Sequence, residues 1–183
     1  GTNVKIYGSV SNNYDASNFD NNVLSQLLAS DTNREKLINN LLDQAIKNNL
    51  TGIVLNFQDM KLKDKDIYTQ FVKECSARLK EKNIKLGVVA PVSEYINTAA
   101  ISNITDFVIL QAYNLRTTSA IVSGATSPSN WIETVLNSLI SQKANMSNII
   151  LEAPMHSILW TEKKDQVISA EIYYANELSQ YLS

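Results

Sequence analysis

Residues 52–57 of the chain read Gly-Ile-Val-Leu-Asn-Phe, an apolar run with one polar residue at position 56. A short run of this kind, without strict alternation, is typical of a strand buried on both faces of a parallel sheet. Similar runs predict strands at 4–10, 86–92, 107–113 and 149–154. Apolar residues at helical spacing predict helices over 23–28, 37–46, 64–82, 96–104, 131–140 and 167–182.

This alternation of strands and helices predicts an α/β fold of about five βα units around a parallel sheet. Two architectures fit the pattern: part of a (β/α) barrel, or an open doubly wound parallel sheet. A complete eight-unit barrel usually takes ~250 residues, and this chain has 183, so a barrel would be incomplete. No linker or change of composition divides the chain, and we expect residues 1–183 to form a single domain.

The composition excludes several function classes. The formal net charge is −2 and the chain has no basic stripe, which argues against nucleic acid as a partner. The one cysteine, Cys75, lies on the apolar face of the 64–82 helix and is expected in the core, and the one histidine, His156, leaves no Cys/His set for a metal. The first strand is not followed by a glycine-rich phosphate loop, so no nucleotide cofactor is expected. No apolar run reaches the ~18 residues of a membrane span.

In either architecture the functional side chains lie at the carboxyl ends of the parallel strands. The polar and aromatic candidates at these positions are Asn56, Gln58, Gln111, Tyr113, Asn114, His156 and Trp160. A tryptophan after a strand offers a flat apolar platform with a polar edge. Trp160 is interpreted either as such a platform or as an anchor for its own loop, and Tyr113 either as a ligand contact or as packing at the sheet end.

The order and spacing of these segments resemble glycoside hydrolase family 18, in its bacterial spore-cortex and cell-wall branch. Residues 50–58 and 84–91 resemble the fourth and fifth barrel strands of that family, while 3–12, 107–114 and 149–154 resemble the third, sixth and seventh. The Gln-x-Tyr-Asn of 111–114 resembles the plant chitinase version of the family's Tyr-Asp motif. The resemblance implies an incomplete TIM-like barrel, either completed by another segment or protein partner or capped by the 167–182 helix.

The sequence departs from the family at the motif that carries its chemistry. The family's Asp-Gly-x-Asp-x-Asp-x-Glu falls on Thr51, Val54, Asn56 and Gln58, so all four carboxylates are replaced. The resemblance implies that the glutamate protonates the glycosidic oxygen and that the substrate's own acetamido oxygen is the nucleophile. A carboxamide at position 58 has no proton to give at neutral pH, although it can still hydrogen-bond a sugar. No catalytic residue, metal or cofactor is therefore expected at this motif.

Three functions remain open at this point. The first is a catalytically inactive glycosidase-like module that binds N-acetylhexosamine glycans such as chitin or peptidoglycan, or serves as a surface or coat protein. Its expected ligand-binding residues are Asn56, Gln58, Gln111, Tyr113, Asn114 and Trp160. The second is a structural or protein-interaction module with a vestigial cleft. The third is an active hydrolase that uses a displaced carboxylate, Glu152 or Asp59. The richness in Asn and Ser favours a secreted or surface protein of an AT-rich organism, and the resemblance implies a bacterial protein that is extracellular or at the cell surface.

Overall fold

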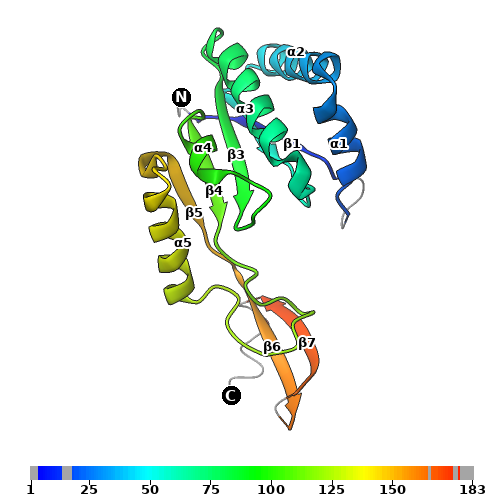
Figure 1. The fold of residues 1–183 in the computed structure, drawn as a ribbon, viewed down its shortest axis with the longest axis vertical. Helices are drawn as coiled ribbons and strands as arrows, with labels where there is room; N and C mark the ends of the chain where they lie inside the picture. Colours follow the sequence, from blue (N-terminus) through cyan, green and yellow to red (C-terminus); the bar gives the residue numbers. More distant parts are fainter. Residues whose placement is uncertain (1–3, 14–17, 165, 175–176, 178–183) are drawn as a thin grey trace.

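The main sheet of the protein is parallel and is wound in one direction. The computed structural model describes residues 4–13, 18–164, 166–174 and 177. The five strands of this sheet are β1 (Tyr7–Ser11), β2 (Gly52–Asn56), β3 (Lys85–Pro91), β4 (Phe107–Gln111) and β5 (Ile149–Glu152). They pair in sequence order, β1-β2-β3-β4-β5, and every pair is parallel (Figure 1).

This strand order decides between the two predicted architectures. Each crossover carries the chain one strand further in the same direction, as in a (β/α) barrel, whereas a doubly wound sheet reverses its direction at a switch point. The α/β prediction and the barrel-like winding are therefore confirmed, and the doubly wound alternative is wrong. Among the described residues β1 and β5 are the two edges of this sheet, so the barrel is not closed.

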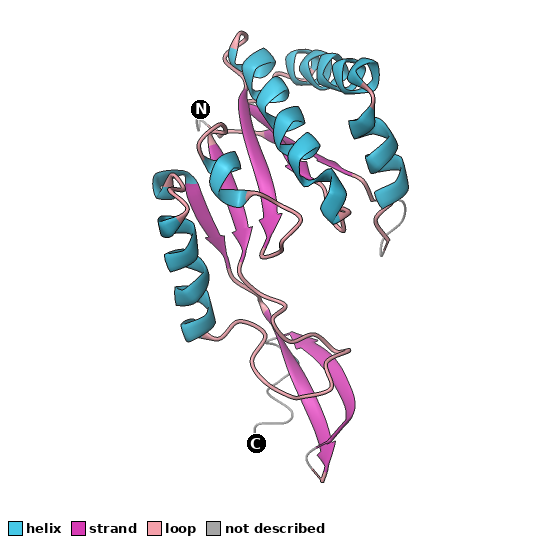
Figure 2. Cartoon of the chain, viewed as in Figure 1, coloured by secondary structure: helices cyan, strands magenta, loops and turns pink. Residues whose placement is uncertain are grey.

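The helices cover one side of the sheet (Figure 2). They are α1 (Asn21–Ala29), α2 (Asp31–Lys47), α3 (Lys65–Lys80), α4 (Thr98–Ser102) and α5 (Ser129–Ser141), with short 3-10 turns η1 (Leu62–Asp64) and η2 (Met146–Asn148). The first two begin at side-chain caps: the Asp20 carboxylate accepts from Asn22 and Val23 N–H, and the Ser30 hydroxyl accepts from Asn33 N–H. None of the described helices is long and apolar enough to cross a membrane.

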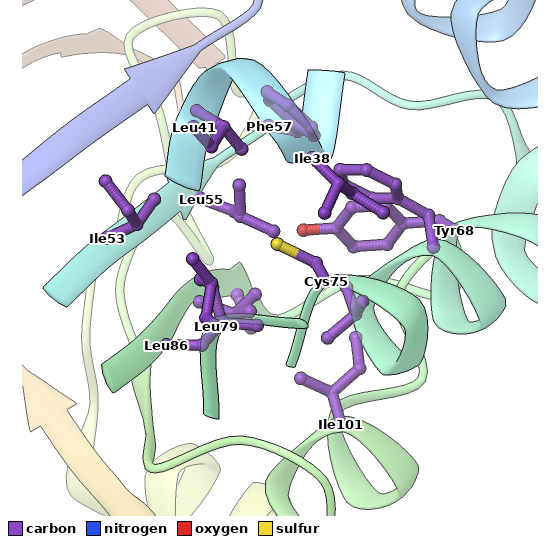
Figure 3. Close-up of a cluster of buried hydrophobic side chains, with 14 of the residues drawn as sticks. Ile38, Leu41, Ile53, Leu55, Phe57, Tyr68, Cys75, Leu79, Leu86 and Ile101 are labelled. Atoms are coloured by element: carbon purple, nitrogen blue, oxygen red, sulfur yellow. The ribbon is translucent and has the colours of Figure 1, made fainter. Parts of the chain in front are cut away.

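The core lies between the sheet and these helices (Figure 3). Alternate residues of β2 and its extension, Ile53, Leu55 and Phe57, are buried against the helices, while Val54 and Asn56 face the other side. Cys75 on α3 is 0% exposed within this cluster. Burial raises the pKa of its thiol to about 12. The prediction of a core thiol is therefore confirmed.

Two glycines allow aromatic rings to lie across the opposite face of the sheet. A Cβ atom on Gly52 would come within 2.7 Å of Cε1 of Tyr7, and one on Gly87 would overlap the ring of Phe107. The two rings meet edge to face with centroids 5.4 Å apart. Since Tyr7 begins β1 and Phe107 begins β4, this aromatic layer fills the amino-terminal half of the face and leaves the carboxyl ends for polar side chains.

The predicted helix over 167–182 is wrong in the part that the structure describes. After β5 the chain forms an antiparallel hairpin of β6 (His156–Lys163) and β7 (Gln166–Tyr174), which extends beyond the carboxyl ends of the parallel strands (Figure 1). The β7 sequence contains Val167, Ile168, Ile172, Tyr173 and Tyr174, and β-branched and aromatic residues favour strands. Residues 167–174 therefore form a strand and not the first half of the predicted helical cap. Except for Glu177, residues 175–183 lie outside the described part.

Candidate functional site

Carboxamide side chains from two non-adjacent strands meet at the carboxyl end of the sheet. Asn56 ends β2, Gln58 follows it by two residues, and Gln111 ends β4. The Gln58 Nε2 group donates to Asn56 Oδ1 at 2.7 Å and to Gln111 Oε1 at 3.1 Å, so the second bond spans the end of β3. The three carboxamides therefore form one connected group, which sequence order alone had placed only at the same sheet edge.

The chain of hydrogen bonds continues to a phenol and a carboxylate. Gln111 Nε2 donates to the Tyr113 hydroxyl at 2.7 Å, and that hydroxyl donates to Glu152 Oε1 at the end of β5, at the longer distance of 3.4 Å. We call Asn56, Gln58, Gln111, Tyr113 and Glu152 the amide network. All five side chains are half-buried, so each is shielded by its neighbours and also reaches the surface.

Glu152 and His156 set the surroundings of the phenol. Partial burial raises the pKa of Tyr113, and the nearby charge of Glu152 raises it further. The imidazole of His156, the first residue of β6, stands perpendicular to the Tyr113 ring with centroids 6.4 Å apart. The hairpin therefore begins beside the amide network.

Asn12, which the sequence analysis did not select, holds the backbone of Gln58. Its Oδ1 accepts from Gln58 N–H at 2.9 Å, and its Nδ2 donates to Gln58 C=O at 3.0 Å. The same Nδ2 donates to Asp20 C=O at 3.4 Å, and Asp20 caps α1. Asn12 directly follows β1, so its side chain continues the β1–β2 pairing past Asn56. A polar residue just beyond a strand end is the sequence signal that could have identified it.

Several predicted residues lie apart from the amide network. Thr51 precedes β2 at the opposite end of the strand, where its hydroxyl accepts from Ile6 N–H at 3.1 Å, and Val54 lies in mid-strand. Asn114 is exposed, has φ +66°, and donates through its backbone N–H to Thr126 Oγ1. Trp160 lies within β6 opposite Ala170, so it belongs to a strand and not to a loop. Within the described residues, no hydrogen bond joins Asn114 or Trp160 to the network.

Asp59, the other candidate for a displaced carboxylate, is exposed with φ +53° and faces a different neighbour. That neighbour is Tyr95, whose pKa is raised chiefly by burial. The charge of Asp59 raises this pKa further, and a hydrogen bond with the Asp59 backbone lowers it. Glu152 is therefore the one carboxylate of the described chain that these hydrogen bonds join to the carboxamides. The described residues contain no group of three or more His, Cys, Asp or Glu able to hold a metal ion.

The network can donate and accept hydrogen bonds, but its three amides cannot transfer a proton as a carboxylic acid does. An amide presents two N–H donors and an oxygen with two lone pairs. This chemistry suits the recognition of hydroxyl and amide groups on a polar ligand. Glu152 is the one carboxylic acid among the five residues of the amide network.

Comparisons with known proteins identify the fold and the family. The model of glycosyl hydrolases family 18 matches residues 1–182. The uncharacterized glycosylase YvbX of Bacillus subtilis is 24% identical over 171 residues, which cover 87% of this chain and 49% of that protein. The crystal structure of the Bacillus subtilis glycosylase YdhD has a TM-score of 0.87 at 19% identity, covering 97% of this chain and 61% of that chain. The crystal structure of the Bacillus cereus spore cortex-lytic enzyme SleL has a TM-score of 0.78 at 20% identity. The match covers 96% of this chain and 41% of that chain.

The chain thus spans about half the length of the curated relative YvbX. The family match extends over nearly all of its residues, and the one-directional parallel sheet agrees with the fold of the solved structures. The chain belongs to glycosyl hydrolases family 18.

Proposed function

We propose that this chain is a non-hydrolytic member of its family that binds glycans containing N-acetylhexosamine, such as chitin or peptidoglycan. One observation carries the proposal: the positions expected to supply the acid and its partner carboxylate are Gln58 and Asn56, and their amides are bonded to each other and to Gln111. Cleavage of a glycosidic bond needs a group that protonates the leaving oxygen. An amide cannot do so, but it can hold a sugar by hydrogen bonds.

The arrangement of the amides supports binding over a vestigial role. The backbone of Gln58 is fixed by two hydrogen bonds from Asn12, and its side chain by two more to Asn56 and Gln111. Side chains held in this way lose little further conformational freedom when a ligand arrives, which favours affinity. All three amides remain half-buried, so they are also open to a ligand.

A cell-wall setting follows from the same proposal. SleL is named as a spore cortex-lytic enzyme, and this chain resembles its fold over 96% of its own length. We therefore propose that the protein acts at the cell surface or outside the cell, where a peptidoglycan or chitin chain is accessible to it.

Two measurements on the same sample test the proposal. Isothermal titration with N-acetylglucosamine oligomers from dimer to hexamer is expected to show binding, and a reducing-end assay on the same oligomers is expected to show no release. Gln58→Ala and Gln111→Ala should each weaken binding by about tenfold, since each removes hydrogen bonds worth about 1 kcal/mol each. The matched control is Gln26→Ala on the exposed face of α1, which should leave affinity unchanged. Absence of binding would refute glycan recognition.

An active hydrolase that uses Glu152 is the second candidate, because that carboxylate is connected to the network through Tyr113. In that case the wild-type chain releases reducing ends, and Glu152→Gln abolishes the release while Asp59→Asn leaves it intact. The absence of any release by the wild type would exclude this candidate and support the non-hydrolytic reading.

A further inference from the structure

We propose that Glu152 is a positioning residue whose negative charge fixes the direction of the hydrogen bonds in the amide network. As a result the site presents one acceptor, Gln58 Oε1, next to one donor group, Asn56 Nδ2. This inference rests on the proposed function only for the identity of the ligand. The direction of the hydrogen bonds belongs to the free protein.

The direction begins at Glu152 because an ionised carboxylate accepts hydrogen bonds and cannot donate them. The Tyr113 hydroxyl has one proton, which points to Glu152 Oε1. At 3.4 Å this contact is longer than an ordinary O–H···O bond. The attraction between the carboxylate charge and the hydroxyl dipole still acts at this distance and orients the hydroxyl. Turning the hydroxyl the other way would leave the lone pairs of the phenol facing a negative charge.

Each following amide is then oriented by the one before it. With its proton committed to Glu152, the Tyr113 oxygen can only accept, and Gln111 Nε2 donates to it at 2.7 Å. This turns Gln111 Oε1 toward Gln58, whose Nε2 donates to it at 3.1 Å. The other hydrogen of Gln58 Nε2 goes to Asn56 Oδ1 at 2.7 Å. The oxygen and nitrogen of a side-chain amide are nearly the same size, so packing alone does not distinguish the two orientations of the amide. The order of donors and acceptors therefore fixes each orientation.

Two groups are left over at the end of the network. Within the described residues, Gln58 Oε1 and Asn56 Nδ2 have no hydrogen-bond partner in the protein, and neither atom is fully buried. They belong to side chains that are bonded to each other, so an acceptor and a donor lie next to each other at the surface of the site.

A neighbouring acceptor and donor are complementary to a secondary amide, which has one N–H and one C=O. The acetamido group of an N-acetylhexosamine is such an amide. An N-deacetylated sugar has an ammonium or amine group in its place and lacks the C=O that Asn56 Nδ2 would serve. The network therefore favours the acetylated form, and this preference depends on Glu152 although that residue is bonded to neither leftover group.

The test compares the tetramer of N-acetylglucosamine with its fully N-deacetylated counterpart by isothermal titration. The quantity measured is the ratio of the two affinities. Glu152→Gln is expected to lower the preference for the acetylated tetramer by about 3- to 10-fold, the equivalent of one neutral hydrogen bond, because a neutral amide can either donate to Tyr113 or accept from it. Tyr113→Phe should lower the ratio similarly, and the double variant should show no additional loss.

A direct contact between Glu152 and the sugar predicts the opposite sign. Removing a carboxylate that attracted the ammonium of the deacetylated tetramer would weaken that ligand and raise the ratio. An unchanged or increased ratio in Glu152→Gln would thus overturn the proposal. The matched control, Glu162→Gln on β6, removes the same charge from an exposed position of the hairpin and should leave the ratio unchanged.

A second measurement on the free protein separates this inference from the proposed function. The side-chain amide proton signals of Gln58 in a ¹⁵N-labelled sample are expected to shift in Glu152→Gln and to stay in place in Glu162→Gln. If wild-type protein binds neither tetramer but Gln58 responds in this way, glycan recognition fails and the role of Glu152 stands. If the Gln58 signals do not respond to Glu152→Gln, the role of Glu152 is refuted whatever the protein binds.

Discussion

Replacing Asn12 with alanine is predicted to destabilise the protein and to loosen the residue at the centre of the amide network. The Asn12 side chain makes hydrogen bonds of 2.9 and 3.0 Å to the N–H and C=O of Gln58, and a longer one of 3.4 Å to Asp20 C=O. A neutral hydrogen bond contributes about 0.5–1.5 kcal/mol net. Because the site is half-buried, water can partly replace the lost groups, so we expect a loss of about 1–2 kcal/mol in the free energy of unfolding.

Asn12→Asp refines the test because it keeps the acceptor, removes the donor and adds a negative charge at pH 7. The carboxylate can still accept from Gln58 N–H, but its second oxygen faces Gln58 C=O with no hydrogen to share. We expect this variant to be no more stable than Asn12→Ala, although aspartate is closer to asparagine in size. Stability would be measured by urea unfolding at pH 7, with Asn13→Ala, an exposed neighbour, as the matched control. The reasoning is refuted if Asn12→Ala lies within about 0.5 kcal/mol of that control, the usual range for surface substitutions.

Three further predictions concern the helices, the aromatic layer and the core. Arg34 is 6% exposed and is paired through Nε and Nη2 with Glu74, and its guanidinium lowers the pKa of that carboxyl from the ordinary value of 4.5. Because the pKa of Glu74 is lower in the folded state, its ionised form stabilises the fold above pH 4.5. This stabilisation is lost as the pH falls through the pKa of Glu74 in the folded protein. Glu74→Gln should therefore cost about 1–3 kcal/mol at pH 7, a figure discounted because the Glu74 side chain is 32% exposed. The cost should shrink progressively as the pH is lowered below 4.5, with Glu35→Gln as control in urea unfolding. Gly87→Ala should cost about 1–3 kcal/mol because its methyl group overlaps the Phe107 ring, and Phe107→Leu in the same chain should recover part of the loss in thermal unfolding. Cys75 should react with a thiol reagent at pH 8 only after unfolding, since burial raises its pKa to about 12; rapid labelling of the native protein would contradict its place in the core.

The parallel sheet was predictable because its strands carry their own signal. Runs such as Gly52–Asn56 are apolar without alternation, and the segment that becomes α3 repeats its apolar residues at helical spacing. The hairpin was not predictable in the same way. In 167–174 apolar residues occur at positions 167, 168, 170 and 172–174, a spacing that also fits a helix face. Pairing with β6 decides the structure there, and pairing with a distant strand is not visible in local periodicity.

The candidate site was predictable to the level of the sheet edge and not further. Asn56, Gln58, Gln111 and Tyr113 were expected at strand ends and are joined by hydrogen bonds. Trp160 and Asn114 were expected beside them on the strength of sequence proximity to the same ends. Trp160 lies instead along β6 of the hairpin. Asn114 has φ +66° and donates its backbone N–H to Thr126. Asn12 escaped notice because its role depends on the register between β1 and β2, with Ser11 opposite Asn56.

The same network bears on why a single reversion at position 58 would not simply recreate an acid. In Gln58→Glu the new carboxylate would lie where Nε2 now contacts Asn56 Oδ1 at 2.7 Å and Gln111 Oε1 at 3.1 Å, so oxygen would face oxygen on both sides. Both amides would have to turn over and offer their nitrogens. Gln111 would then present its oxygen to Tyr113, and the Tyr113 proton could serve either Gln111 or Glu152 but not both. Two carboxylates would compete for the direction of one hydrogen-bonded chain. The carboxamides at 56, 58 and 111 and the carboxylate of Glu152 are therefore mutually dependent, and a change at one of them requires changes at the others.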